Sequence, residues 1–133
     1  MKKGREKITI ILCLLLAVLC SSSSLVTRHV KSSMLQLAEQ AIARDIRDDI
    51  PDSEAEKIKP ILQSIVTRWE TYEPIISTYS RHDEAERVTS AVQKLRPLWD
   101  TRQFTELHMT LHELSDALEH LQKTESPSIA NIL

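Results

Sequence analysis

The histidine spacing in the last third of the chain is the clearest candidate for chemistry. His108 and His112 are four residues apart, and Asp116 and His120 continue the row at the same step. Residues i and i+4 share one face of a helix, so two imidazoles there can chelate zinc or copper, with a carboxylate as third ligand. The glutamate of a His-Glu-x-x-His metalloprotease is absent, because Met109 stands in its place. The alternative is that these histidines only form the polar edge of a packing seam.

A second histidine is followed by acidic residues. His82 precedes Asp83, Glu84 and Glu86, and the apolar spacing predicts that it lies on the inward side of its helix. Burial or a carboxylate neighbour can move the protonation of an imidazole across neutral pH, so His82 is a candidate pH-sensitive residue. The alternative is a partly buried histidine that is hydrogen-bonded within a bundle.

Two further groups have plain structural explanations. Four aromatic residues could line a ligand groove, but such residues more commonly fill gaps between helices. An acidic run lacks the glycine and the ligand spacing of an EF-hand, and indicates a solvated helix junction. The aromatic residues are Trp69, Tyr72, Tyr79 and Trp99, and the run is Asp45, Asp48, Asp49, Asp52 and Glu54.

No nucleophile elbow, phosphate loop or cysteine-pair motif occurs, so we predict no enzyme, no catalytic residue and no cofactor.

The helices that must position these residues are separated by prolines and by one capping signal. Apolar spacing predicts a helix over 30–50, ended by Pro51, because the residue before a proline avoids the α region. Ser53 and Glu56 fit a capping box that starts the next helix. Pro60 interrupts that helix, which either kinks there or begins its main part there.

The last two helices show the strongest patterns. Pro74 opens or kinks a third helix, which Pro97 ends, and Asp100 starts the last one. In the last helix Phe104 and five leucines recur at steps of three and four, which is typical of a packing seam. Short loops between amphipathic helices favour antiparallel neighbours. The leucines are Leu107, Leu111, Leu114, Leu118 and Leu121.

Composition agrees with an all-α protein. The chain has one glycine and only 4% aromatic residues, whereas a β-rich protein of this size needs glycine at turns and bulges. Residues 27–133 carry 13 basic and 18 acidic side chains, a net charge of -5. This mildly acidic part lacks the basic face that nucleic-acid binding requires, so we expect no nucleic-acid partner.

An apolar segment near the N-terminus predicts a membrane anchor. The stretch 8–27 is uncharged and about 30 Å long as a helix, which matches the thickness of a bilayer core. Four basic residues and one acidic residue in 2–7 predict a cytoplasmic N-terminus, with the chain beyond Arg28 outside. Both cysteines, Cys13 and Cys20, lie in this segment, so no disulfide supports the rest.

Two alternatives for this segment remain open. A cleaved secretory signal would leave a secreted helical protein, but the cleavage site around Ser22 and Ser24 lacks Ala-x-Ala. A lipoprotein signal would end at Cys20, but Leu19 occupies the position where a lipobox has a small residue. The length of the segment favours an uncleaved signal-anchor.

The combination of features resembles a known family. It comprises the basic tip, the apolar anchor, Trp69, a proline-led helix with His82 and acidic residues, the leucine stripe, and a terminal Asn131-Ile132-Leu133. It is similar to a family of short bacterial membrane-anchored helical proteins, classified as a domain of unknown function. The resemblance covers most of the chain through diffuse motifs. It implies a membrane-associated helical protein and transfers no catalytic residue.

The sequence thus predicts an all-α protein with an N-terminal transmembrane helix and a small antiparallel bundle of three to four helices. We expect a cytoplasmic tip at 1–7, a transmembrane segment at 8–27, an extracytoplasmic bundle at 28–125 and a tail at 126–133. The expected role is interaction, with an envelope protein or with itself. The alternative is a ligand- or metal-binding sensor that uses His108 and His112.

Overall fold

Four helices make up the part of the chain that the structure describes. The computed structural model gives the backbone of residues 2–125, and their side chains except at 23, 24, 79, 124 and 125. The helices are α1 (Lys2–Ile42), α2 (Asp52–Tyr79), α3 (His82–Asp100) and α4 (Phe104–Glu125), and no strand occurs in this part. The predicted all-α class is therefore confirmed. The expected tail at 126–133 and the side chain of Tyr79 lie outside the described residues.

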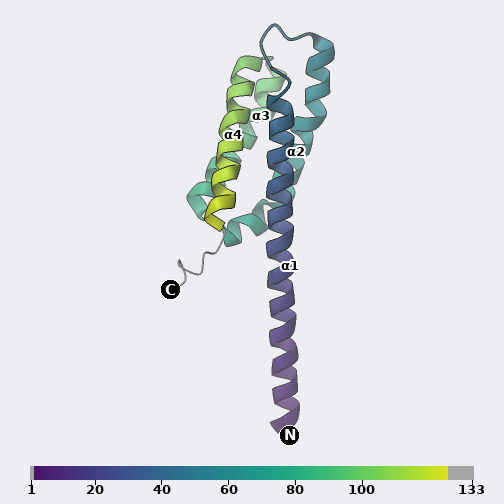
Figure 1. Ribbon diagram of the computed structural model, residues 1–133, viewed down its shortest axis with the longest axis vertical. Helices are drawn as coiled ribbons and strands as arrows, with labels where there is room; N and C mark the ends of the chain where they lie inside the picture. The colour runs from purple at the N-terminus through teal and green to yellow at the C-terminus, as the bar shows by residue number, and fades with distance from the viewer. Residues whose placement is uncertain (1, 126–133) are drawn as a thin grey trace.

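The helices form an up-down bundle with one long projection. α1 packs against α2 and α4, and α3 packs against the same two helices, so the four form a ring in chain order. Figure 1 shows that only the C-terminal half of α1 belongs to this ring. The N-terminal half continues alone beyond the bundle. We call this projection the stem, the end of the bundle from which it emerges the stem end, and the opposite end the far end.

The stem is apolar and has no packing partner among the described residues. Its leucines at 12, 14, 15, 16 and 19 are each 54–61% exposed, and the described side chains from Ile8 to Val26 are all exposed. α1 is the one described helix that is long and apolar enough to cross a membrane. Exposure of this much apolar area to water is unfavourable.

The core lies between the four helices and is built from the predicted stripes. α1 contributes Val30, Met34, Ala38 and Ala41, which are spaced by three or four residues. The leucine stripe of α4 is fully buried, with 0% exposure at each position, which confirms the packing seam. Its members are Leu107, Leu111, Leu114, Leu118 and Leu121.

The first helix ends earlier than the sequence predicts. α1 stops at Ile42 rather than continuing to residue 50. Asp45 adopts a left-handed backbone with φ of 52°, and its N–H donates to the carbonyl of Ile42 at 3.3 Å. Aspartate tolerates this conformation better than most residues. Ile46 is therefore buried from a loop and not from a helix face.

The start of α2 also differs from its prediction. Pro51 is the N-cap and makes no side-chain cap bond, so Ser53 lies inside the first turn and the predicted capping box does not form. The carbonyl of Pro51 accepts from the N–H groups of Glu54 and Ala55, both at 3.0 Å. The prediction was wrong because Pro51 has the extended backbone that an N-cap needs, two residues before Ser53.

Prolines interrupt the helices less than expected. Pro60 and Pro74 lie inside α2, and Pro97 lies inside α3. Consequently the third helix begins at His82 and not at Pro74, and Asp100 ends α3 instead of starting α4. A proline costs about 3 kcal/mol inside a helix, and packing of the residues that follow it can offset that cost. Beyond Pro74 and Pro97, Ile76 is buried and Leu98 packs on the core.

Candidate functional site

The two histidines of the predicted metal site meet on α4. Their Nε2 atoms are 3.2 Å apart, and the rings lie edge to face with centroids separated by 4.7 Å. Two imidazole ligands of a tetrahedral zinc ion, each about 2.0–2.1 Å from the metal, would have a similar separation. One imidazole donating a hydrogen bond to the other also explains it. The geometry thus accommodates either arrangement of His108 and His112.

The rest of the predicted histidine row does not join this pair. His120 lies beside α3, with its Nε2 at 3.1 Å from Oε1 of the buried Glu84. Asp116 is exposed. Within residues 2–125, no group of three or more histidine, cysteine or acidic side chains is arranged to hold a metal ion. The described residues therefore offer a metal two imidazole ligands and no third one.

A hollow at the far end lies next to His108. It has a volume of about 480 Å³ and is lined by the loop residues 45–49 and by Thr105, His108 and Met109. Nδ1 of His108 is buried and has no hydrogen-bond partner among the described residues. Asp48 closes the loop onto α4, because its Oδ1 accepts from the N–H of Thr105 at 3.1 Å. This hydrogen bond lowers the pKa of Asp48 below its ordinary value.

The acidic run forms the solvated junction that the sequence indicated. Asp45, Asp48, Asp49 and Asp52 are all exposed at the far end. Asp52 accepts from Arg102 at 2.6 Å, which links the start of α2 to the loop before α4 and raises the pKa of Arg102. Asp48 and Asp52 thus make hydrogen bonds that connect segments at the far end of the bundle.

His82 does not lie on the inward side of its helix. It is the first residue of α3, its side chain is 85% exposed, and its Nε2 is 3.1 Å from Oε1 of Glu86. The inward placement was wrong because it assumed a helix continuing from Pro74, whereas the chain turns at Ser80 and Arg81. A pH-sensitive role for His82 stays a prediction.

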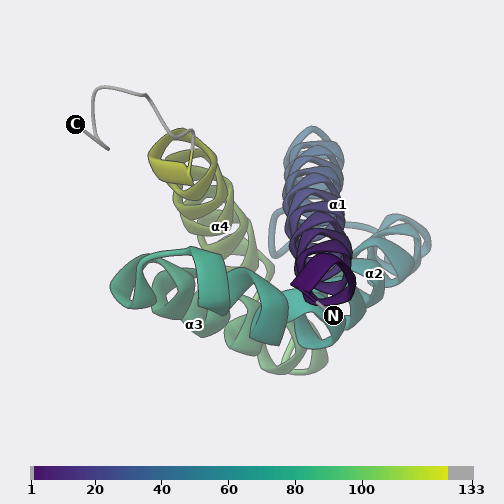
Figure 2. The ribbon, with the colours of Figure 1, turned by 90° about the horizontal axis from the view of Figure 1, so that it is seen from below.

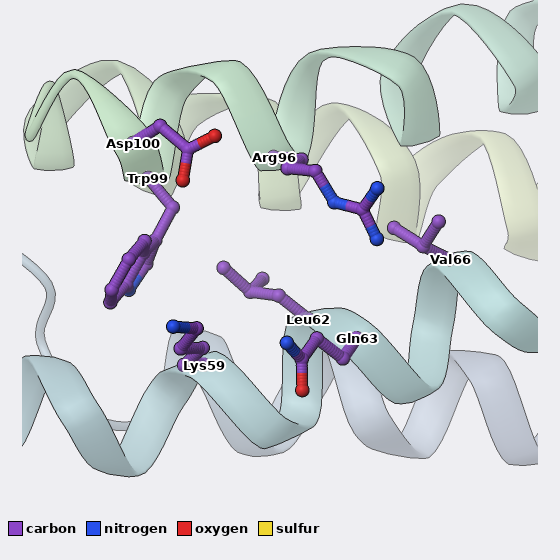
Figure 3. A pocket seen from close by; sticks show the side chains of 7 residues that line it. All are labelled: Lys59, Leu62, Gln63, Val66, Arg96, Trp99 and Asp100. Atoms are coloured by element: carbon purple, nitrogen blue, oxygen red, sulfur yellow. The ribbon is translucent and has the colours of Figure 1, made fainter.

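Figure 3 shows a groove between α2 and α3, and Trp99, one of the four aromatic residues considered for a ligand groove, lines it. Leu62 and Val66 form its apolar floor. Lys59 and Trp99 face each other across it, with the lysine Nζ 4.7 Å from the ring centroid, a cation–π distance. Arg96 and Asp100 add a charge of each sign along the α3 side. This part encloses about 70 Å³.

A wider hollow continues the groove toward the stem end. It measures about 510 Å³ and shares Val66 and Arg96 with the first part, so the two form one surface, here called the α2–α3 groove. Trp69 lines this part while donating its Nε1–H to the hydroxyl of Thr89 at 2.9 Å. Both tryptophans therefore pack in the bundle and also face the groove. The other lining residues are Glu70, Glu73, Val92, Gln93 and Pro97.

Apart from Trp69 and Trp99, the sequence contains no local signal for this groove. Its two walls come from antiparallel helices, so Leu62 and Trp99 face each other although they are far apart in the chain. Each polar residue at its edge looks like an ordinary exposed helix position when taken alone. Only the pairing of α2 with α3 brings them together.

A buried lysine is the other feature that the sequence did not reveal. Lys31 lies on the inward face of α1 one turn above the stem and is 1% exposed. Burial, and the nearby charge of Arg28, lower its pKa to about 8. The apolar spacing did not predict the burial of Lys31, because lysine is rarely found on the inward face of a helix.

Comparison with known proteins identifies a family whose function is unknown. The model of a family described as a domain of unknown function, DUF4363, matches residues 24–132. No curated protein and no solved structure matches the chain significantly.

Proposed function

The chain belongs to the DUF4363 family, a domain of unknown function, and we propose that it is a single-pass membrane-anchored interaction protein of the cell envelope. The observation that carries this proposal is the stem, an apolar helix whose described side chains are exposed on every side. A helix that buries none of its apolar surface within its own chain is suited to lipid. The bundle would then stand outside the cytoplasm, since the basic residues lie before the stem.

The α2–α3 groove is the surface that we assign to the interaction. Its floor of Leu62, Val66 and Trp69 is apolar, and charges of both signs stand along its edges. Apolar centres with polar rims are the usual anatomy of protein interfaces. The partner is an envelope protein or a second copy of this chain. We assign no catalytic role to the groove, and the proposal is that the protein is not an enzyme.

Site-specific photo-crosslinking in membranes tests the interaction. A photoreactive amino acid at Gln63 or Gln93, both exposed at the groove, should give a discrete crosslinked product. Its mass distinguishes a second copy from another envelope protein. The same amino acid at Gln36, exposed on α1 and not among the groove residues, is the control.

A charge reversal completes this test. Arg96→Glu should abolish the product, whereas Lys94→Glu, the same change two residues earlier on α3 and outside the groove lining, should leave it intact. Absence of a product at both glutamines, or equal products at Gln36, would remove the groove from consideration.

Topology is tested separately by protease treatment of intact cells. Cleavage beyond Arg28 is expected if the bundle is extracytoplasmic, and protection of that region would reverse the orientation. N-terminal sequencing of the membrane-bound protein should recover residues of the basic tip. A mature N-terminus after Ser22 or Ser24 would instead support the secreted alternative.

A metal-binding sensor is the second candidate, and the 3.2 Å separation of the two Nε2 atoms favours it. Zinc or copper should raise the thermal unfolding temperature, and His112→Ala should remove that shift. His82→Ala is the matched control, because His82 is an exposed histidine on another helix. No shift with either metal would exclude this candidate.

A further inference from the structure

The bundle covers α1 from Thr27 onward. Val26 is 43% exposed, whereas Thr27, the next residue, is 3% exposed and Val30 is 5% exposed. α1 runs through this point without a break. On this inward face Cys20 is exposed and Thr27 is the first described buried residue, so the bundle covers α1 from Thr27 at the latest.

The same point is the end of the uncharged stretch. Residues 8–27 carry no charge, and Arg28 and His29 follow directly. The bundle thus covers α1 by the last residue of the uncharged stretch. If the uncharged stretch spans the bilayer, no helical spacer is left between the bilayer surface and the bundle.

The stem end of the bundle contains the turn between α2 and α3. Figure 1 shows this turn at the end from which the stem emerges. Arg81 is exposed in the turn, and Ile75 is 40% exposed in the last two turns of α2. Among the described residues of 28–125, Ile75 and Met109 are the exposed large hydrophobic side chains.

We propose that the stem end of the bundle, with Arg28, Ile75 and Arg81, rests in the headgroup layer of the membrane that the stem crosses. Guanidinium groups suit lipid phosphates, and an exposed isoleucine suits the boundary with the acyl chains. Arg81 lies 3.6 Å from Asp83, and the pair is exposed, so the guanidinium stays accessible to lipid phosphates. This inference rests on the proposed membrane anchoring. In this arrangement the bundle lies directly on the bilayer surface and is not held away from it by an exposed helical spacer.

Depth-dependent quenching in vesicles tests the contact. Full-length protein with Cys13→Ala and Cys20→Ala receives one fluorophore through Ile75→Cys or Met109→Cys. The vesicles are phosphatidylcholine containing phosphatidylcholine with a doxyl quencher near the headgroup. Met109 is the matched control, since it is the other exposed hydrophobic residue and lines the far-end hollow. The expected result is a loss of fluorescence at position 75 and none at position 109.

A lengthened stem supplies the second variant. Seven helix-forming residues of mixed charge inserted between Val26 and Thr27 lengthen the helix by about 10 Å and nearly two full turns. The bundle therefore keeps nearly the same rotational orientation about the stem axis. Quenching at position 75 should then disappear. Persistence of quenching in the lengthened protein would overturn the proposed contact.

Carbonate extraction of the same vesicles separates the two proposals. Protein that resists extraction but shows no quenching at position 75 overturns the headgroup contact and leaves the anchor intact. Protein that is extracted from the vesicles overturns the anchor and the contact together. Extraction-resistant protein quenched equally at 75 and 109 also overturns the contact, because the far end should lie above the bilayer.

Discussion

The two halves of α1 are one continuous helix in two different environments. In the stem, the described residues from Ile8 to Val26 are exposed around the whole circumference. In the covered half, one face is buried every three or four residues, from Thr27 to Ala41, while the opposite face is polar. The stem is apolar on every side, and the covered half on one side only. The covered half thus has the pattern of a helix with protein on one face and water on the other, and the stem has the pattern expected of the proposed membrane anchor.

Charges placed in the stem should produce the largest effect. Leu12→Arg combined with Leu16→Arg puts two charges in the apolar stretch, at a cost of about 3 kcal/mol each near a bilayer centre. We expect the protein to become extractable from membranes by alkaline carbonate. Leu12→Ala with Leu16→Ala is the control and should stay in the pellet. If the double arginine variant also stayed there, lipid would not be the environment of the stem.

A cavity in the bundle should affect the covered half and not the stem. Leu111→Ala removes a side chain with 0% exposure, and such changes cost about 2–5 kcal/mol. The measurement is thermal unfolding in detergent followed by circular dichroism, with membrane extraction unchanged. Met109→Ala, at a side chain that is 60% exposed, should change the unfolding temperature little. Equal losses for both variants would contradict the assignment of the core.

Lys31, at the junction of the two halves, should make stability depend on pH. Its pKa falls from 10.5 to about 8 on folding, so between these values the unfolded chain holds a proton that the folded chain has released. The free energy of unfolding should therefore rise as pH increases from about 8 to 10.5, by about 3 kcal/mol at most. Lys31→Met should flatten this rise in a series of denaturant titrations. A rise of unchanged size in Lys31→Met would assign it to another group.

The smallest effect is expected at the far end, where Asp48 holds the loop against α4. Asp48→Ala removes the acceptor for the N–H of Thr105 and should lower the unfolding temperature by less than Leu111→Ala does. Asp48→Asn keeps an acceptor oxygen but carries no charge, so it should lose part of this contribution, less than Asp48→Ala does. The lowered pKa of Asp48 means that its contribution is present above about pH 3.8 and is lost as pH falls through that lowered value. An acid-independent loss in Asp48→Ala would show that the carboxylate charge is not involved.

The candidate sites were predictable only where one helix supplies all their residues. His108 and His112 are four residues apart on one helix, so helical geometry alone brings their rings together. His82 was misplaced because its orientation depends on where α3 begins, and that start follows from a turn with no glycine or proline to mark it. For the α2–α3 groove the sequence offered only Trp69 and Trp99 as candidate lining residues, because each wall is an ordinary helix surface until the other helix lies beside it.

By itself, the sequence determined the helical class, the apolar stem, the inward leucines of α4 and the family match over residues 24–132. These properties depend on residue type and on spacing within one helix, where each contact is local. Only the tertiary structure decided that helices continue through Pro60, Pro74 and Pro97, and that Lys31 is buried. It also decided that the bundle covers α1 by Thr27, where the uncharged stretch ends. Each of these outcomes depends on packing between segments distant in the chain, which can outweigh local preference.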